Sequence, residues 1–370
     1  MKKDWEYKKL GEVANVIHGK NQKEVLSANG KYPIYGSGGT IMGYATEYLC
    51  EAGTTILGRK GTINNPQFIN HKFWNVDTAF GISARKDIDS KFLYFFIKKQ
   101  DWSKMNTGTT LPSLTQAIVK NVIIPIPPLS EQKAIVEYLD SSFAKIDKLK
   151  ANAAKNLEEA KALFQSALKD ALEPKEGWIT NTLKDECHKI TDGTHQTPQY
   201  FTDGYIFLSS KNVTNRVIDW NNVKYIDEAQ HQAMQKRVSP KFGDILLAKN
   251  GTTGVGAIVD REIEFDIYVS LALLRTIGNV IPEYMLCYVN SPMAKMQFNK
   301  RLIGMGVPNL HLREINQVEI SYPPNKIEQK EIVKQINELD EKLNTLQQNY
   351  SRICNECDAL KQAILRQVFE

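Results

Sequence analysis

Two long stretches of the chain show the hydrophobic spacing of α-helices. In residues 326–370, apolar positions alternate steps of four and three residues from Ile332 to Ile364, which is the spacing of a coiled-coil seam. Residues 129–173 show a similar but less strict spacing, after a predicted N-cap at Ser130. Neither stretch has an interior Pro or Gly, so each is predicted to form one helix of roughly 40 residues and about 60 Å.

An apolar seam of this kind has to be buried. The predicted interface residues are Ile135, Leu139, Ile146, Leu149, Leu157 and Phe164 in the first helix, and Ile332, Ile336, Leu339, Leu343, Leu346, Tyr350, Ile353, Leu360 and Ile364 in the second. Two helices of matching length in one chain favour antiparallel pairing with each other. The alternative is that each helix lies on its own domain, but a helix of about 60 Å overruns a domain roughly 30 Å across.

A different pattern precedes each helix. Short β-branched and aromatic runs, such as Thr54–Leu57 and Asp244–Leu247, are separated by Gly-rich turns, and a helical stretch follows at 90–99 and 282–289. This pattern predicts an α+β fold with two globular α/β domains, each containing a mixed, curved sheet. The predicted boundaries are residues 1–128 and 174–325 for the globular domains, and 129–173 and 326–370 for the helices.

The two halves of the chain repeat one plan. Residues 108–140 match residues 304–340: Pro112 pairs with Pro308, and the Pro-Pro pairs at 127–128 and 323–324 precede Glu-Gln-Lys at 131–133 and 328–330. The segment from Gly53 to Thr62 matches the one from Gly243 to Thr252, and the starts of the two halves, Trp5–Leu10 and Trp178–Leu183, match more faintly. The sequence therefore predicts a pseudo-twofold internal repeat.

Composition narrows the class of protein. The chain has 370 residues, of which 42% are hydrophobic and 24% charged, and no stretch approaches the roughly 20 apolar residues of a membrane helix. No apolar signal core follows the N-terminus, and five irregularly spaced cysteines do not predict a disulfide framework. Cys354 and Cys357 have metal-knuckle spacing, but they fall in the helical pattern and are interpreted as core residues. A cytoplasmic protein is expected.

Positive charge is concentrated in the first domain. Residues 1–128 hold 17 Lys and Arg against 10 Asp and Glu, a net charge of +7, whereas residues 174–325 hold 16 of each. The first domain therefore carries the signal for binding a polyanion, and the second does not.

The chain resembles the specificity subunits of type I restriction-modification enzymes. The resemblance lies in the segments that open the two helices, PIPPLSEQKAIVEYLD and YPPNKIEQKEIVKQINELD, and in YPIYGSGG at 32–39, GRKGT at 58–62 and GDILLAKNGTTG at 243–254. It implies two target recognition domains that each read one half of a split DNA target, with the helices as spacer and docking surface. The implied partners are double-stranded DNA, two methylation subunits and restriction subunits. S-adenosylmethionine, ATP and Mg are expected on the partner subunits only, so this chain is expected to need no cofactor.

Reading DNA requires loops that carry amide, hydroxyl and cationic side chains. The candidates in the first domain are Lys20, Asn21, Gln22, Ser37, Thr40, Arg59, Lys60, Thr62, Asn64, Asn106, Thr109 and Thr110. Those in the second are Thr194, His195, Gln196, Lys211, Asn212, Lys249, Asn250, Thr252, Thr253, Arg301 and Asn309. Arg59-Lys60 and Lys249-Asn250 stand out because they occupy equivalent places in the two copies.

Patterns that suggest an enzyme are incomplete. In Gly53–Lys60, Arg and Lys replace the Lys and hydroxyl of a phosphate-binding P-loop. The stretch 65–68 reads Asn-Pro-Gln-Phe, where adenine methyltransferases carry Asn-Pro-Pro-Phe, and no Gly-rich cofactor loop accompanies it. The six histidines form no metal-binding set, and neither a catalytic nor a metal site is predicted. A DNA-binding, non-catalytic subunit is the leading hypothesis. Its rivals are a coiled-coil structural protein with protein-binding ends, and a fused methyltransferase.

Overall fold

The structure, a computed structural model, describes residues 5–214, 216–251, 253–302 and 309–370. The chain divides into two compact units. Unit 1 comprises Met1–Ala154 and Tyr350–Glu370, and unit 2 comprises Lys155–Asn349. Each unit therefore holds one globular domain together with part of each of the two long helices, α4 (Leu129–Leu172) and α10 (Lys326–Phe369).

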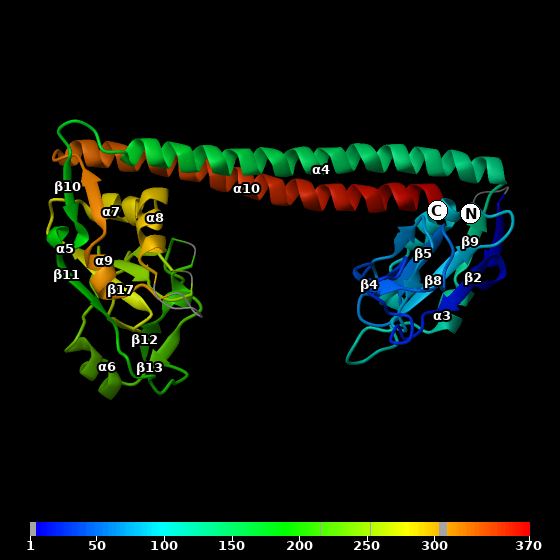
Figure 1. Cartoon of the computed structure of the whole chain (residues 1–370), viewed down its shortest axis with the longest axis horizontal. Helices are drawn as coiled ribbons and strands as arrows, with labels where there is room; N and C mark the ends of the chain where they lie inside the picture. Colours follow the sequence, from blue (N-terminus) through cyan, green and yellow to red (C-terminus); the bar gives the residue numbers. More distant parts are fainter. Residues whose placement is uncertain (1–4, 215, 252, 303–308) are drawn as a thin grey trace. The chain divides into compact units, whose positions relative to one another are not determined.

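Three small sheets build the domain of unit 1 (Figure 1). The largest is antiparallel, in the order β2 (Ala14–His18), β8 (Ala79–Ala84), β5 (Thr54–Gly58) and β6 (Gln67–Ile69). A second has the order β4 (Ile41–Ala45), β3 (Tyr32–Tyr35) and β7 (Trp74–Asn75), with β3 and β7 parallel. The third pairs β1 (Glu6–Lys9) with β9 (Ile123–Ile126).

Unit 2 repeats this topology strand for strand. Its four-stranded sheet has the order β11 (Cys187–Asp192), β17 (Leu271–Thr276), β14 (Ile245–Ala248) and β15 (Gly256–Ile258). Its mixed sheet has the order β13 (Lys224–Ile226), β12 (Tyr205–Leu208) and β16 (Phe265–Ile267), and β10 (Ile179–Thr182) pairs with β18 (Glu319–Tyr322). The predicted α+β class and internal repeat are thus confirmed.

The helices follow the repeat with two additions in unit 2, a 3-10 helix after β12 and a helix between β13 and β14. Unit 1 has α1 (Leu10–Val13), α2 (Ser90–Lys99), the 3-10 helix η1 (Trp102–Met105) and α3 (Gln116–Asn121). Unit 2 has α5 (Leu183–Glu186), η2 (Ser210–Asn212), α7 (Pro282–Val289), α8 (Pro292–Lys300) and α9 (Leu312–Asn316). Unit 2 also has α6 (Glu228–Gln235) between β13 and β14, where unit 1 connects β4 to β5 by the short loop 46–53.

The long helices run antiparallel within each unit. In unit 1, Lys150 of α4 pairs with Asp358 of α10 at 2.9 Å, and Asp147, one turn earlier, pairs with Lys361, one turn later. In unit 2, Phe164 and Leu168 of α4 share a core cluster with the N-terminal residues of α10, from Ile332 to Ile336. The predicted antiparallel pairing is therefore confirmed.

The helix pairs also pack on their own domains, so the alternative arrangement holds in part as well. Phe92 and Phe95 of α2 contact Phe369 and Phe143, with ring centroids 5.2 Å and 5.6 Å apart. In unit 2, Tyr284 and Tyr288 of α7 belong to the same core cluster as the helix residues. The apolar face of each helix is thus shared between its partner helix and a domain.

This sharing corrects the predicted seam. Six of the predicted residues are buried, namely Leu139, Ile146, Leu157, Phe164, Ile332 and Ile336. Ile135, Leu343, Tyr350, Ile353 and Ile364 are half-buried. Leu149, Leu339, Leu346 and Leu360 are 38–54% exposed. A straight helix drifts by about 20° per heptad relative to a 3.5-residue repeat, so positions chosen at strict seam spacing leave the buried face.

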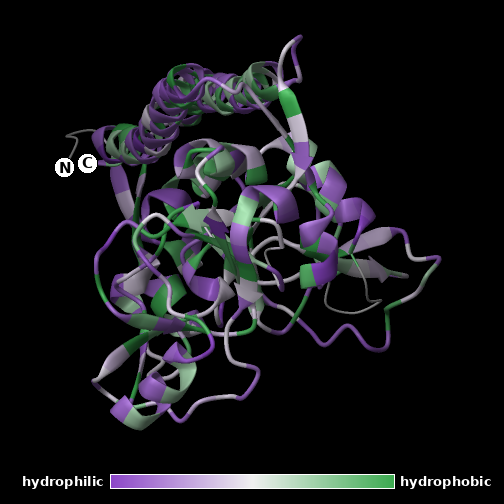
Figure 2. Cartoon of the chain, turned by 90° about the vertical axis from the view of Figure 1, so that its left-hand side faces the viewer, coloured by the Kyte–Doolittle hydropathy of each residue, from purple (hydrophilic) through white to green (hydrophobic). Residues whose placement is uncertain are grey.

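The start of the first long helix also differs from the expectation. The helix begins at Leu129, so that Ser130 lies inside the first turn and is exposed rather than capping it. Figure 2 shows green hydrophobic and purple hydrophilic residues interspersed along the long helices. Among the described residues, no helix has a stretch long and apolar enough to cross a membrane.

Candidate nucleic-acid interface

The ends of several strands converge in unit 1 on the connection between β7 and β8. Backbone N–H groups that follow β2, Gly19 and Lys20, donate to the carbonyls of Ala79 and Asn75, both at 3.0 Å. The N–H of Arg59, directly after β5, donates to Thr78 at 2.8 Å, and the N–H of Val76 donates to Tyr35 of β3 at 3.1 Å. We call residues 18–20, 35–37, 58–62 and 75–79 the unit 1 platform.

Unit 2 builds the equivalent platform from residues 192–196, 208–212, 248–251 and 267–270. Thr194, after β11, donates from its N–H to Ile267 at 3.0 Å, and Lys249, after β14, donates to Ser270 at 2.8 Å. The N–H of Tyr268 donates to Leu208, the last residue of β12, at 2.9 Å. Loops from three strands are therefore fixed side by side in both units, at the ends where their polar residues begin.

One glycine in each platform makes this convergence possible. A Cβ at Gly19 would lie 1.8 Å from the carbonyl oxygen of Val76, and a Cβ at Gly193 would lie 1.8 Å from that of Ile267. No larger residue fits between the crossing backbones. The match also shows that His18 and Asp192, the residues before these glycines, are equivalent positions.

Five of the predicted DNA-binding residues of the first domain lie on the unit 1 platform: Lys20, Ser37, Arg59, Lys60 and Thr62. Lys20, Lys60 and Thr62 are exposed, and Arg59 is half-buried and donates from Nη1 to the carbonyl of Asp77 at 3.1 Å. The loop 107–113 is joined to the platform by the N–H of Gly61, which donates to Pro112 at 2.9 Å. This loop carries the exposed candidates Thr109 and Thr110.

Other candidates of the first domain organise loops. The Asn64 amide accepts from the N–H of Trp102 at 2.9 Å, and Asn106 accepts from the N–H groups of Gly108 and Ser113, both at 2.8 Å. Asn21 accepts from the N–H of Lys23 at 3.0 Å. Gln22 is half-buried at the start of a turn, and Thr40 is exposed where the β3–β4 hairpin closes.

In unit 2 the structure changes the interpretation of Lys249. Its side chain is only 6% exposed, and its ammonium lies 2.6 Å from Oδ2 of Asp192, which is 4% exposed. A buried, paired ammonium is not presented to a phosphate in this conformation. The predicted equivalence of Lys249 with Arg59 holds for the backbone, since Leu310 donates to Lys249 as Leu114 donates to Arg59. It does not hold for the side chain, because a carboxylate lies beside Lys249.

Asn212 and Arg301 are likewise engaged inside the domain. The buried Asn212 amide donates to the carbonyls of Asp219 and Asn222, and the Arg301 guanidinium donates to those of Gln297 and Gln317. The Asn212 side chain thus ties loops together in the interior, whereas the half-buried Arg301 links the end of α8 to the end of α9.

The remaining candidates of the second domain lie nearer the surface. Thr194, His195 and Gln196 follow β11, with His195 and Gln196 exposed, and Lys211 is exposed. The half-buried residues Asn250 and Asn309 form a β-bridge, which corresponds to the bridge between Lys60 and Ser113 in unit 1. Thr253 hydrogen-bonds to the carbonyls of Lys249 and Gly251. Thr252 lies outside the described residues.

Sequence reasoning missed Arg237. Its guanidinium is half exposed and donates from Nη2 to Oδ1 of Asp192 at 2.6 Å. It follows α6, the helix that unit 1 lacks, so the repeat gave no signal for it. In the sequence, only the adjacent basic pair Lys236-Arg237 indicated a charged surface at this place.

Comparisons with known proteins identify the family. The model of the type I restriction modification DNA specificity domain matches the chain twice, over residues 2–159 and 175–353. The chain belongs to this family. Its two matches coincide with the two copies of the fold, so it is a type I DNA specificity protein with two specificity domains.

Curated relatives extend over most of the chain. A putative type I restriction enzyme specificity subunit of Haemophilus influenzae is 25% identical over 92% of this chain and 89% of its own length. The EcoKI specificity subunit of Escherichia coli is 24% identical over 81% of this chain and 70% of its own length. The rival hypothesis of a coiled-coil structural protein receives no support from these relatives.

Solved structures agree with the fold. A chain from a structural study of complex assembly and conformational transition of the type I R-M system aligns with a TM-score of 0.76 at 19% identity, over 100% of this chain and 98% of that one. The HsdS subunit from Thermoanaerobacter tengcongensis aligns with a TM-score of 0.57 at 18% identity, over 100% and 97%.

A buried glutamine fastens each specificity domain to its long helix. Gln132 is fully buried, accepts from the N–H of Asp89 at 2.8 Å and donates to the carbonyls of Asp87 and Pro127. Gln329 makes the same three bonds in unit 2, with Ile281, Asn279 and Pro323. The central glutamine of the repeated Glu-Gln-Lys motif thus makes this contact, a role that the sequence did not reveal.

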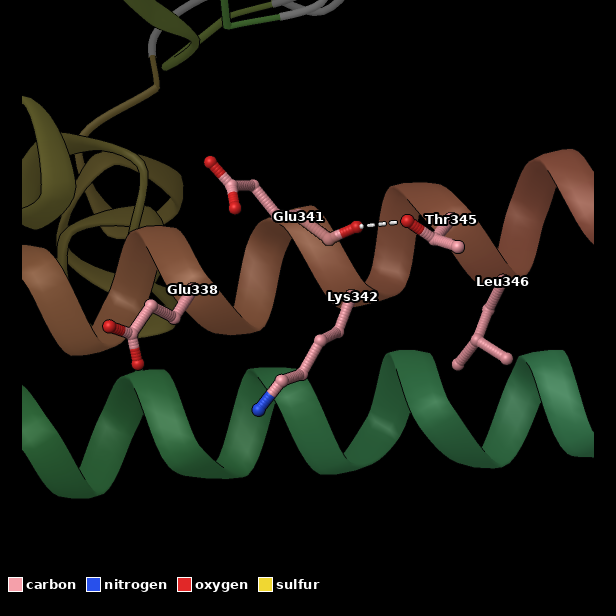
Figure 3. Close-up of a pocket in the computed structure, with 5 residues that line it drawn as sticks. All are labelled: Glu338, Glu341, Lys342, Thr345 and Leu346. Carbon is pink, nitrogen blue, oxygen red and sulfur yellow. Dashed lines mark hydrogen bonds between the residues drawn. The ribbon is translucent and has the colours of Figure 1, made fainter.

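The long helices leave a groove and apolar side chains uncovered. Glu338, Glu341, Lys342, Thr345 and Leu346 of α10 line a groove of about 470 Å³. Figure 3 shows Glu338, Lys342 and Leu346 directed toward α4, while the Thr345 hydroxyl donates to the carbonyl of Glu341 at 2.9 Å. Leu163 of α4 is 71% exposed. Among the described residues, no group of three or more His, Cys, Asp or Glu is placed to hold a metal ion.

Proposed function

We propose that this specificity protein reads a two-part DNA target, with one platform for each half, and that it has no catalytic centre of its own. One observation carries the proposal: the same convergence of strand-end loops is built twice in one chain, once in each unit. Each platform presents side chains that donate to phosphates and base edges, including Lys20 and Lys60 in unit 1 and Gln196 in unit 2.

The uneven charge gives the two domains different tasks. Exposed Lys and Arg side chains on and around the unit 1 platform supply most of its affinity for DNA, because their binding releases counterions from the phosphates. The domain of unit 2 is neutral in sequence and contributes less salt-sensitive affinity and more of its binding through uncharged donors.

Partner subunits supply the chemistry. We propose that two methylation subunits dock on the long helices, where the exposed leucines Leu149, Leu163, Leu346 and Leu360 offer apolar contacts. Restriction subunits join in the full complex. S-adenosylmethionine, ATP and Mg bind to those partners and not to this chain, and the complex acts in the cytoplasm, where DNA and its methylation subunits meet.

A domain exchange tests the proposal. The full chain is combined with its methylation subunits, and its target is mapped by methylation of random duplex DNA. Residues 5–126 are then replaced by the equivalent segment of a relative with a different target. We expect one half of the target to change and the other half, with the gap, to remain. Simultaneous change of both halves, or methylation without sequence preference, would refute independent reading by the two platforms.

A further inference from the structure

Asp192, at the end of β11, is the centre of a cationic cluster in unit 2. Its Oδ2 lies 2.6 Å from the Lys249 ammonium, and its Oδ1 lies 2.6 Å from the Arg237 guanidinium and 3.3 Å from the imidazole of His195. Burial alone would raise the pKa of Asp192, but hydrogen bonds from Lys249 and Arg237 outweigh it, and the pKa lies below the usual range. Asp192 is therefore an ionised carboxylate that holds two cations in place.

The two cations are presented differently. Lys249 is buried, whereas the Arg237 side chain is 50% exposed. Two bonds fix one edge of the Arg237 guanidinium: Nε donates to the carbonyl of Asp192 at 3.2 Å, and Nη2 donates to its carboxylate. Nη1 has no hydrogen-bond partner in the part of the chain that the structure describes. A clamped guanidinium of this kind offers its second edge as a rigid, planar pair of donors.

Arg237 is also part of the lining of a pocket. Arg237 lines a cavity of about 260 Å³ with Thr194, Gln196 and Thr197 of the platform loop and with Gln230 and Met234 of α6. Gln230 holds the loop after β11 in place, because its side-chain amide accepts from the N–H of Gln199 at 2.9 Å and donates to the Gln199 carbonyl at 3.1 Å. The insertion of α6 therefore adds a second wall beside the platform, and this wall carries Arg237.

The equivalent positions of the first domain carry different side chains from those around Asp192. His18 stands in unit 1 where Asp192 stands in unit 2, and Arg59 stands where Lys249 stands. Arg59 bonds to a backbone carbonyl and has no carboxylate partner among the described residues. The platform cation is thus available in unit 1 and neutralised in unit 2, where Arg237 takes over the exposed position.

We propose that Arg237 is a specificity-determining residue of the second domain, whose free edge binds the two major-groove acceptors of a guanine, and that Asp192 is its positioning residue. The inference rests on the proposed function, because it assigns a base contact to the unit 2 platform. Guanine O6 and N7 match the spacing of a guanidinium edge, and such a pair discriminates against other bases by about 5- to 150-fold.

Substitution of Arg237 tests the base contact. The full chain with its methylation subunits is assayed on duplexes that carry all four base pairs at each target position. R237A and R237K are both expected to lose the preference for guanine at one position of one half-site by about 5- to 150-fold, with the other half-site unchanged. Lysine keeps the charge but lacks the planar fork. K236A removes the same charge from the adjacent exposed residue and should keep the target.

Asp192 is tested without changing net charge. The double variant D192N/K249M removes one negative and one positive charge, so the salt dependence of DNA binding should stay the same. The guanine preference should weaken at the position that R237A affects and at no other, whereas a general loss of structure would weaken every position. Retention of the full preference in the double variant would refute the positioning role.

The outcomes separate this inference from the function on which it rests. If R237A weakens binding to all duplexes equally and lowers the salt slope by about one, Arg237 contacts a phosphate and the base-reading role is wrong. If R237A and R237K both keep the wild-type preference, Arg237 makes no contact that specifies a base. A wild-type complex without any sequence preference would refute the proposed function itself, and the inference with it.

Discussion

The buried glutamines allow a prediction with a magnitude. Q132L replaces the fully buried amide of Gln132 with an apolar side chain of similar size, so no large cavity forms. It removes three hydrogen bonds at once and leaves the N–H of Asp89 and the carbonyls of Asp87 and Pro127 without their partner. The substitution therefore separates the loss of hydrogen bonds from a change in packing.

The expected cost follows from how exposed each orphaned group is. The bond to Pro127 is buried, and leaving its carbonyl unsatisfied costs about 1–3 kcal/mol. The bonds to Asp89 and Asp87 are partly buried, so water replaces part of each and their loss costs about 0.5–1 kcal/mol apiece. We expect unit 1 to lose about 3 kcal/mol of its free energy of unfolding, a fall in Tm of roughly 6–12 °C.

Urea unfolding followed by circular dichroism measures the loss, and hydrogen exchange locates it. The amide of Asp89 should exchange much faster in Q132L, and the amide of Ile281 should do so in Q329L. The control is Q335L, because Gln335 is an exposed glutamine of α10 whose side chain donates to Glu331 on the surface. If Q132L and Q335L change the free energy of unfolding by equal amounts, below about 0.5 kcal/mol, the buried amides do not fasten the domains to the helices.

Three further predictions concern charge, spacing and acid. Neutralising Arg59 and Lys60 together should flatten the slope of log affinity against log salt by about one to two units, and an unchanged slope would mean that both face away from DNA. Adding three heptads near the middle of both α4 and α10 should lengthen the gap in the target by about nine base pairs. Adding one heptad should impair binding, because it rotates the second half-site by about 100° relative to its recognition domain. Equal tolerance of both insertions would contradict this. Because the folded pKa of Asp192 is lowered, its contribution to stability is complete above the unfolded value of about 3.9 and is lost as the pH falls through the lower folded value. D192N/K249M should lack this part of the acid dependence in a pH series of thermal unfolding, and an acid transition identical to that of the wild type would disprove it.

The repeat and the helices could be predicted because they depend on local signals. Apolar spacing and the absence of Pro and Gly over 129–173 and 326–370 do not depend on distant contacts, and the paired Pro-Pro and Glu-Gln-Lys segments lie in the same order in both halves. The tips of the strands could also be found, because Gly and polar residues cluster where the strands end. Lys20, Ser37, Arg59 and Lys60 were chosen from that pattern, and the structure brings them together.

What each side chain does at those tips could not be predicted. Lys249 and Arg59 look alike in sequence, yet only Lys249 lies beside a buried carboxylate, which comes from a strand 57 residues away in the chain. Asn64, Asn106 and Asn212 have the composition of DNA-reading residues but hold loops together. A polar side chain bonds to the nearest suitable partner, and that partner is fixed by the tertiary fold.

The sequence by itself thus determined the class of fold, the duplication and the family, since these are written in periodicity and in the order of short segments. The tertiary structure alone decided that the apolar face of each long helix is shared with a domain, so that Leu149 and Leu360 are exposed while Cys357 and Phe369 are buried. It alone decided that Gln132 and Gln329 lie in the interior. Burial and pairing depend on which surfaces meet in space, and one-dimensional spacing cannot specify contacts between residues that are far apart in the chain.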